Sequence, residues 1–173
     1  MAAGVGTAAD WQNRERRNRF PRHPARQIIM ETIKKVTIIL VNYNGTNDTL
    51  ACLDSLRGID YPAYNIIVVD NASKDTHELV DDVGFSFPEV KIITIPQNRG
   101  FSGGNNVGIE YALAHQSDYV LLLNNDTTVA PDFLSKLVEA AESNERIGIA
   151  GPKIYYHAEP TRIWYAGGNF SWR

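Results

Sequence analysis

Residues 121–128 have the sequence LLLNNDTT, in which an apolar run passes directly into amide, carboxylate and hydroxyl side chains. A short apolar run of this kind is typical of a buried strand, here one that ends at Leu123. Asn124, Asn125 and Asp126 then place oxygen atoms at the end of the strand, and oxygen ligands suit a hard divalent cation. The same residues are also ordinary turn chemistry before a helix, so this stretch alone leaves both interpretations open.

The change from apolar to polar residues occurs three more times, after Val41, Val69 and Ile95. We expect strands at residues 33–41, 64–69, 90–95 and 119–123. Helices are expected after Thr46 or Asn47, around residues 79–80, through residues 107–114 and from Pro131, with residues 97–104 as a loop. This order predicts an α/β fold with a mostly parallel central sheet and helices on both faces. Ligands of such sheets bind at the carboxyl ends of the strands, where all four polar ends would meet.

The C-terminal part of the sequence has a different pattern. Residues 147–156 and 163–168 are short, aromatic and interrupted by Gly and Pro, which predicts short strands of a mixed sheet. Residues 170–173 are again aromatic and strand-like, and no closing helix follows them. We therefore expect residues 31–173 to form one domain that is truncated at its C-terminus.

Composition limits the class of protein. A chain of 173 residues with 43% hydrophobic residues is expected to form about one globular domain. Its single cysteine, Cys52, excludes an internal disulfide, and its four scattered histidines show no zinc-ligand spacing. Cys52 lies among leucines and is expected in the core. No apolar stretch reaches the ~20 residues of a membrane span and no signal sequence is present, so we expect a cytoplasmic protein.

Charge is distributed unevenly along the chain. Six of the 17 Lys and Arg residues precede residue 30, and the remainder of the chain is acidic. We interpret residues 1–30 as a disordered basic arm or an added extension; binding to nucleic acid or to an anionic membrane is the alternative. An acidic body with few aromatics beside basic residues disfavours a nucleic-acid partner.

The polar strand ends each have a functional and a structural interpretation. Asp70 is placed to contact a base or ribose, or to cap the following helix. Arg99, with Gly103 and Gly104, could meet phosphate by charge and backbone N–H groups, or these residues could form a glycine-tolerant loop. Tyr43 could stack on a nucleobase or simply pack.

Two common nucleotide-binding signatures are missing. A Rossmann fingerprint needs G-x-G-x-x-G after the first strand, whereas residues 100–104 place glycines after the third strand. The P-loop motif is also absent from the sequence. A nicotinamide cofactor and a P-loop nucleoside triphosphatase are therefore disfavoured.

Four motifs together resemble the family 2 glycosyltransferases, particularly the bacterial rhamnosyltransferase-like branch that builds surface polysaccharides. They are VNYNG at residues 41–45, VVDNASKD at residues 68–75, NRGFSGGNN at residues 98–106 and LLNNDT at residues 122–127. The resemblance runs from about residue 36 to residue 172, and four motifs in the right order are far more specific than any one of them.

The resemblance implies a GT-A fold, a nucleotide-diphosphate sugar donor and Mg²⁺ or Mn²⁺ at the family's D-x-D position. That position is residues 124–126, where Asp126 would be the main metal ligand and Asn124 a second one. The residues implied as donor-binding are Tyr43, Asn44, Asp70, Asn71, Arg99, Gly103, Gly104 and Asn125.

The implied activity is inverting transfer of a sugar to a polysaccharide or lipid-linked acceptor, with peripheral association at the inner membrane face. The family's catalytic base lies beyond the matching stretch and is expected past Arg173, so residues 31–173 would be mainly the donor- and metal-binding half. A non-catalytic nucleotide-binding module is the first alternative. A sugar-1-phosphate nucleotidyltransferase is less favoured, because residues 42–45 lack its glycine-rich basic loop.

Overall fold

The computed structural model describes residues 33–168. The predicted arm at residues 1–30 and the aromatic residues 170–173 lie outside the described residues. The elements alternate between strand and helix as predicted, and then end in two short strands. They are β1 (Val36–Asn42), α2 (Thr46–Leu56), β2 (Tyr64–Asp70), α3 (Thr76–Ser86), β3 (Lys91–Thr94), α4 (Gly100–Ala114), β4 (Tyr119–Asn124), α5 (Phe133–Glu142), β5 (Ile154–Tyr156) and β6 (Glu159–Tyr165).

The first four strands form one sheet in the order β3-β2-β1-β4, and every pair in it is parallel. The register places Asn42 beside Asp70 and Val41 beside Asn124. The polar ends of β1, β2 and β4 therefore lie at one edge of the sheet, which confirms the predicted α/β architecture.

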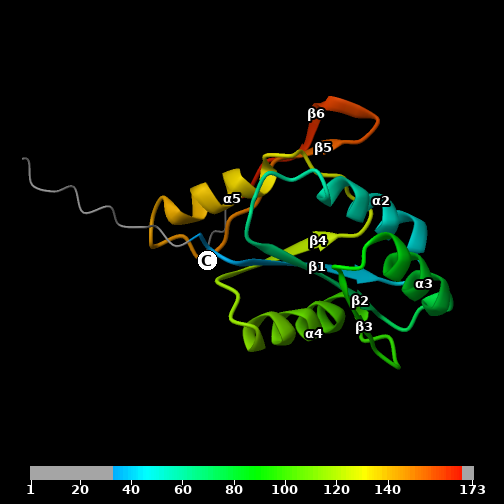
Figure 1. The fold of residues 1–173 in the computed structure, drawn as a ribbon. Coiled ribbons are helices and arrows are strands. Elements are labelled where there is room, and N and C mark those ends of the chain that lie inside the picture. The colour runs from blue at the N-terminus through cyan, green and yellow to red at the C-terminus, as the bar shows by residue number, and fades with distance from the viewer. Residues whose placement is uncertain (1–32, 169–173) are drawn as a thin grey trace, which may run out of the picture. The chain divides into compact units, whose positions relative to one another are not determined.

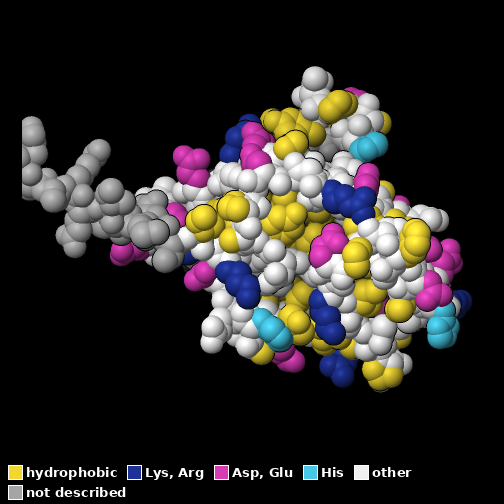
Figure 2. Space-filling view, in the orientation of Figure 1, with side chains coloured by type: hydrophobic (Ala, Val, Ile, Leu, Met, Phe, Trp, Pro, Cys, Tyr) yellow, Lys and Arg dark blue, Asp and Glu magenta, His cyan; other side chains and the backbone are white. Residues whose placement is uncertain are grey.

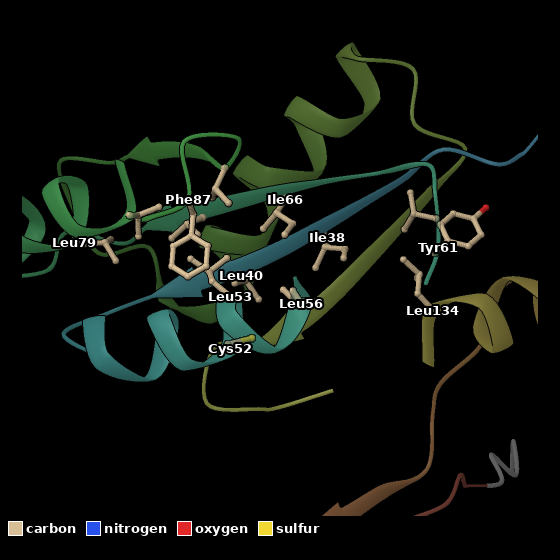
Figure 3. Close-up of a cluster of buried hydrophobic side chains, with 14 residues drawn as sticks. Ile38, Leu40, Cys52, Leu53, Leu56, Tyr61, Ile66, Leu79, Phe87 and Leu134 are labelled. Carbon is tan, nitrogen blue, oxygen red and sulfur yellow. The ribbon is translucent and has the colours of Figure 1, made fainter. Parts of the chain in front are cut away.

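Helices cover both faces of this sheet, as predicted (Figure 1). On one face, Ile38 and Leu40 of β1 pack with Leu53 and Leu56 of α2, and the same cluster includes Leu134 of α5. Figure 3 shows these side chains gathered between the helices and the sheet. On the other face, a smaller cluster of buried strand residues packs against partly buried side chains of α4.

Two glycines let α4 lie very close to β1. A Cβ atom at Gly104 would be 2.8 Å from Cγ1 of Val41, and one at Gly108 would be 2.5 Å from Cγ2 of Ile39. These positions are about one helical turn apart and face Val41 and Ile39, which lie two residues apart on the same face of the central strand. Close packing against the sheet therefore favours glycine at both.

The structure corrects two helix starts. Helix α4 begins at Gly100, so most of the predicted loop 97–104 is helical. Glycine is a poor helix former, but here packing against β1 outweighs local propensity. Helix α5 begins at Phe133 and not at Pro131, whose carbonyl oxygen accepts a hydrogen bond from the backbone N–H of Asp60 at 3.0 Å.

The C-terminal strands differ in their bounds from the prediction: β5 covers only residues 154–156 of the expected stretch 147–156, whereas β6 begins at Glu159, before the expected start at residue 163. Only β5 and β6 are strands, and they pair antiparallel with each other. Within residues 33–168 they join no larger mixed sheet. None of the helices among these residues is long and apolar enough to cross a membrane.

Candidate functional site

Asn42, the last residue of β1, joins three of the strand ends. It is completely buried. Its Nδ2 donates to Oδ1 of Asp70 and to Oγ of Ser73, both at 3.0 Å. Its Oδ1 accepts from Oγ1 of Thr49 at 3.0 Å and from Nδ2 of Asn125 at 3.5 Å. One amide therefore connects the loops after β1, β2 and β4.

The loops after β1 and β2 are joined along their length. The backbone N–H of Asn44 donates to Oγ of Ser73 at 2.9 Å, and Oδ1 of Asn44 accepts from the backbone N–H of Lys74 at 2.8 Å. Asn44 and Ala72 both have positive φ, of 55° and 63°. Each loop therefore turns sharply two residues after its strand ends, and the two turns pack as a pair.

Asp70 is held in the interior of the loop after β2. It is 1% exposed. Its Oδ2 accepts from Oγ1 of Thr76 at 2.6 Å and from the backbone N–H of Ser73 at 3.3 Å. Burial raises the pKa of this carboxyl, but the hydrogen bonds that it accepts outweigh burial and leave the pKa below its ordinary value. Asp70 therefore stays ionised and fixes its loop, while Asp75 occupies the N-cap position of α3.

Asn71 links the second strand end to the loop before α4. Its side chain is 2% exposed. Its Nδ2 donates to Oδ1 of Asn98 at 3.0 Å and to the carbonyl oxygen of Gly100 at 3.1 Å. Its Oδ1 accepts from the backbone N–H of Arg99 at 2.9 Å. The backbone N–H of Asn71 also donates to the carbonyl oxygen of Asn42 at 2.8 Å, so hydrogen bonds run from residue 98 through Asn71 and Asn42 to Asn125.

Side chains exposed at this edge of the sheet are available to a ligand. Tyr43 is 52% exposed, so packing in the core does not account for it. Arg99 is exposed immediately before α4, at the end of the helix whose free N–H groups favour anions. Gly103 lies in the first turn of that helix and Gly104 is buried against β1. Tyr43 and Arg99 thus flank the hydrogen-bonded loops.

At the end of β4, Asn125 and Asp126 have different surroundings. Nδ2 of Asn125 donates to Oγ1 of Thr49 at 3.0 Å, so this side chain ties β4 to α2. Asp126 is exposed. Nearby in α2, burial raises the pKa of the Cys52 thiol to about 11, as expected for a cysteine of the core.

Several residues of the network were not singled out from the sequence. They are Asn42, Thr49, Ser73, Thr76 and Asn98. Asn42 and Thr49 are fully buried polar residues. Two signals in the sequence would have indicated that they are buried hydrogen-bond partners. Asn42 comes directly after an apolar strand, and Thr49 lies among the apolar positions of a helix.

A cavity lies away from this edge of the sheet. It is lined by residues that include Leu53, Arg57, Tyr64 and Phe87, and the Arg57 guanidinium lies 4.3 Å from the centre of the Phe87 ring. Its lining reaches Ile66 of β2, and Asp70 is the last residue of that strand, so about 13 Å of strand separates the cavity from the polar edge. We do not include this cavity in the site.

The sequence over these loops matches a known family. The model described as glycosyl transferase family 2 matches residues 37–172. The chain belongs to glycosyl transferase family 2. All four strand ends and every candidate residue above lie inside the matched range.

The names of two curated relatives place those proteins in glycan assembly. The succinoglycan biosynthesis protein ExoO of Rhizobium meliloti is 29% identical over 115 residues, which cover 66% of this chain and 32% of ExoO. The dTDP-rhamnosyl transferase RfbF of Shigella flexneri is 29% identical over 87 residues, covering 50% of this chain and 28% of RfbF. This chain thus spans about a third of the length of the relatives it matches.

Solved structures support the GT-A fold. The mannosyltransferase PcManGT from Pyrobaculum calidifontis, in complex with GDP-Man and Mn²⁺, matches with a TM-score of 0.58 and 24% identity, over 64% of this chain and 33% of PcManGT. The TarS 1–349 structure from S. aureus, in complex with UDP-GlcNAc, matches with a TM-score of 0.55 and 18% identity, over 75% of this chain and 45% of that chain. The fold predicted from the four motifs is confirmed.

The position at which the resemblance implies a metal has two exposed side chains that carry oxygen atoms. The side chains of Asn124 and Asp126 are both exposed, while the carbonyl oxygen of Asn124 accepts from the backbone N–H of Thr127 at 3.3 Å. Within residues 33–168 no three His, Cys, Asp or Glu side chains form a metal-binding group. One carboxylate and one amide oxygen suit Mg²⁺, which proteins often hold through one or two carboxylates plus substrate phosphates. The residues present therefore fit a cation that a diphosphate ligand helps to bind.

Proposed function

We propose that this chain carries the nucleotide-sugar-binding part of an inverting glycosyltransferase, which transfers a sugar from a nucleotide-diphosphate donor to a polysaccharide or lipid-linked acceptor. One observation carries the proposal: in a family 2 protein, four loops at the carboxyl edge of a parallel sheet are joined by hydrogen bonds around exposed Tyr43, Arg99 and Asp126. The donors printed for PcManGT and TarS, GDP-Man and UDP-GlcNAc, support it.

In this proposal the exposed side chains contact the donor. Tyr43 stacks on the nucleobase, because an aromatic face accepts any base. Arg99 and the N-terminal end of α4, the segment that contains Gly103 and Gly104, bind the diphosphate, because both present positive charge to its oxygens.

The more buried polar residues have a supporting part. Asn44 and Asp70 fix the loop that presents Tyr43, and Asn125 fixes the end of β4 next to Asp126. Their hydrogen bonds are already made within the protein, so the loops need little reordering when a donor binds.

Transfer places negative charge on the oxygens that leave the anomeric carbon. Asp126 would hold Mg²⁺ or Mn²⁺ with the side chain of Asn124, and when bound such a cation stabilises that charge as a Lewis acid. The guanidinium of Arg99 is proposed to neutralise charge on the same diphosphate through hydrogen bonds. Inversion also requires a base for the acceptor hydroxyl, which is not assigned to a residue of this chain.

Calorimetric titration tests donor binding. UDP-, dTDP- and GDP-sugars are titrated with and without Mn²⁺; at least one is expected to bind, and more tightly with the metal. Asp126→Ala is expected to remove the metal-dependent part. Asp82→Ala, an exposed aspartate of α3, is the matched control and is expected to behave as the unchanged protein.

Two outcomes contradict the proposal. If none of the donors binds in any condition, donor binding itself is rejected. If Asp126→Ala keeps all of the metal dependence, Asp126 is rejected as the metal ligand. Donor binding without transfer to any acceptor by the full-length protein would favour the non-catalytic nucleotide-binding module instead.

A further inference from the structure

The side-chain amide of Asn71 makes three hydrogen bonds, and all of them reach residues 98–100. It donates to Oδ1 of Asn98 at 3.0 Å and to the carbonyl oxygen of Gly100 at 3.1 Å, and it accepts from the backbone N–H of Arg99 at 2.9 Å. At 2% exposure the side chain has little surface left for a ligand. All three side-chain hydrogen bonds of Asn71 are therefore made with the loop at residues 98–100.

The loop is folded around this amide. Oδ1 of Asn98 also accepts from the backbone N–H of Gly100 at 2.7 Å, and Gly100 has a φ of 69°. An ionised carboxylate at position 71 could accept from Arg99 but could donate nothing to Asn98 or Gly100. Only an amide satisfies both sides of the loop.

Gly103 leaves space for the side chain of Arg99. A Cβ atom at Gly103 would lie 2.5 Å from the Cβ atom of Arg99, a distance at which the arginine would have to move. The backbone of Arg99 is therefore fixed by Asn71, and its side chain begins in the space that Gly103 leaves open. Among residues 33–168, no carboxylate forms a salt bridge with its guanidinium.

We propose that Asn71 is a positioning residue: it folds residues 98–100 so that Arg99 and the start of α4 face the donor diphosphate, and it does not contact the donor itself. This inference rests on the proposed function and refines the expectation that Asn71 is a donor contact.

A matched pair of substitutions separates hydrogen bonding from charge. Asn71→Asp and Asn98→Asp each add one negative charge beside the backbone of residues 99–100. The side chain of Asn98 acts only as an acceptor, through Oδ1, so Asn98→Asp keeps both hydrogen bonds that this atom accepts. Asn71→Asp loses the two hydrogen bonds that Nδ2 of Asn71 donates. We expect Asn71→Asp to weaken binding of UDP, dTDP or GDP by about tenfold to 100-fold. The weakening by Asn98→Asp is expected to stay within about threefold.

The parent nucleoside supplies an internal reference. Its affinity, measured by NMR titration, is expected to stay unchanged in both variants, because the nucleoside has no diphosphate for Arg99 to bind. An equal loss for nucleoside and diphosphate would mean that Asn71 supports the whole site and not Arg99, and would overturn the inference.

A double-mutant cycle tests whether Asn71 acts through Arg99. If it does, the loss of diphosphate affinity in Asn71→Asp combined with Arg99→Ala should be clearly smaller than the sum of the two single losses. Fully additive losses would overturn the inference.

The pH dependence of diphosphate binding gives a further test. In Asn71→Asp the new carboxyl regains a donor when it is protonated. The diphosphate affinity of this variant, relative to that of the unchanged protein, should therefore rise as pH falls towards 4.

Asn98→Ala keeps the test decisive if Asn71→Asp does not fold. It removes the acceptor used by Asn71 and Gly100 without adding charge. If Asn71 positions residues 98–100, Asn98→Ala should bind diphosphate more weakly than Asn98→Asp. If the loop acts only through its charge, the order of the two affinities should be reversed. Protection of Cys52 from a thiol reagent reports that each variant is folded.

The outcomes distinguish the two proposals. If the unchanged protein binds none of the nucleoside diphosphates, the proposed function and this inference fail together. If it binds one, but Asn71→Asp behaves as Asn98→Asp does, only the inference fails.

Discussion

Strands β1 and β4 are neighbours in one sheet and are similarly apolar, but their burial differs. In β1, Ile38, Ile39 and Leu40 are completely buried. In β4, Leu122 is 47% exposed and Leu121 and Leu123 are partly buried. Within residues 33–168 strand β4 is the edge of the sheet and β1 lies between two strands. Burial of a parallel strand is therefore decided by its neighbours and not by its own composition.

The extent of side-chain burial also differs between the regions before and after β4. Helices α2, α3 and α4 bury residues on both faces of the sheet, whereas α5 has one fully buried side chain, Leu134. Ile163 and Trp164 of β6 are 48% and 61% exposed. Hydrophobic side chains are open to solvent around the β5–β6 hairpin (Figure 2). Residues 33–118 should accordingly account for most of the stability of the described chain.

The largest effect should come from shortening one leucine in each of the two neighbouring strands. Leu40→Ala is expected to lower the free energy of unfolding by about 2–5 kcal/mol, because it leaves a cavity in the core. Leu122→Ala is expected to cost less than about 1 kcal/mol, because much of that side chain already meets solvent. Urea unfolding of both variants measures the difference. Equal losses would mean that β4 is as well buried as β1.

Adding one methyl group to a glycine should have an intermediate effect. Gly108→Ala is expected to cost about 1–3 kcal/mol, because the new Cβ would overlap Ile39. Gly148 has no atoms within 4 Å of an added Cβ and lies in the exposed region. Gly148→Ala should leave stability unchanged or raise it by up to about 1 kcal/mol. Similar losses at both glycines would remove the proposed difference in packing between the two regions.

The smallest effect should be a pH dependence that originates in the well-packed region. The pKa of Asp70 is lowered in the folded protein, so its stabilisation is present above the unfolded value of about 4 and is lost as pH falls through the folded value. The stability difference between the unchanged protein and Asp70→Asn should therefore shrink below about pH 4. Urea unfolding at several pH values from 6 to 3 measures it, and a constant difference would contradict this account.

Much of the fold follows from local sequence patterns. The four strands, the order of the helices and the position of Cys52 in the core were predictable, because β-branched runs and helical spacing of apolar residues indicate the type of each element directly. The start of α4 was not predictable, because Gly103 and Gly104 are typical of a loop, and only the tertiary structure shows that Gly104 packs against Val41.

The candidate site was predictable in part. Asp70 and Asp126 were located at strand ends by the motifs that contain them. Their surroundings were not: Asp70 is enclosed by hydrogen bonds, whereas Asp126 is exposed. The connecting role of Asn42 depends on Thr49, Ser73 and Asn125, whose contacts with it span up to 83 positions in the sequence.

The sequence alone determined the class of fold, the family and the residue types present at the end of each strand, because these depend on periodicity and on short motifs. The tertiary structure decided which of those residues are buried as supports and which remain exposed for a ligand. That division depends on strand order, register and the approach of α4 to β1. These are contacts between distant segments, and no local pattern encodes them.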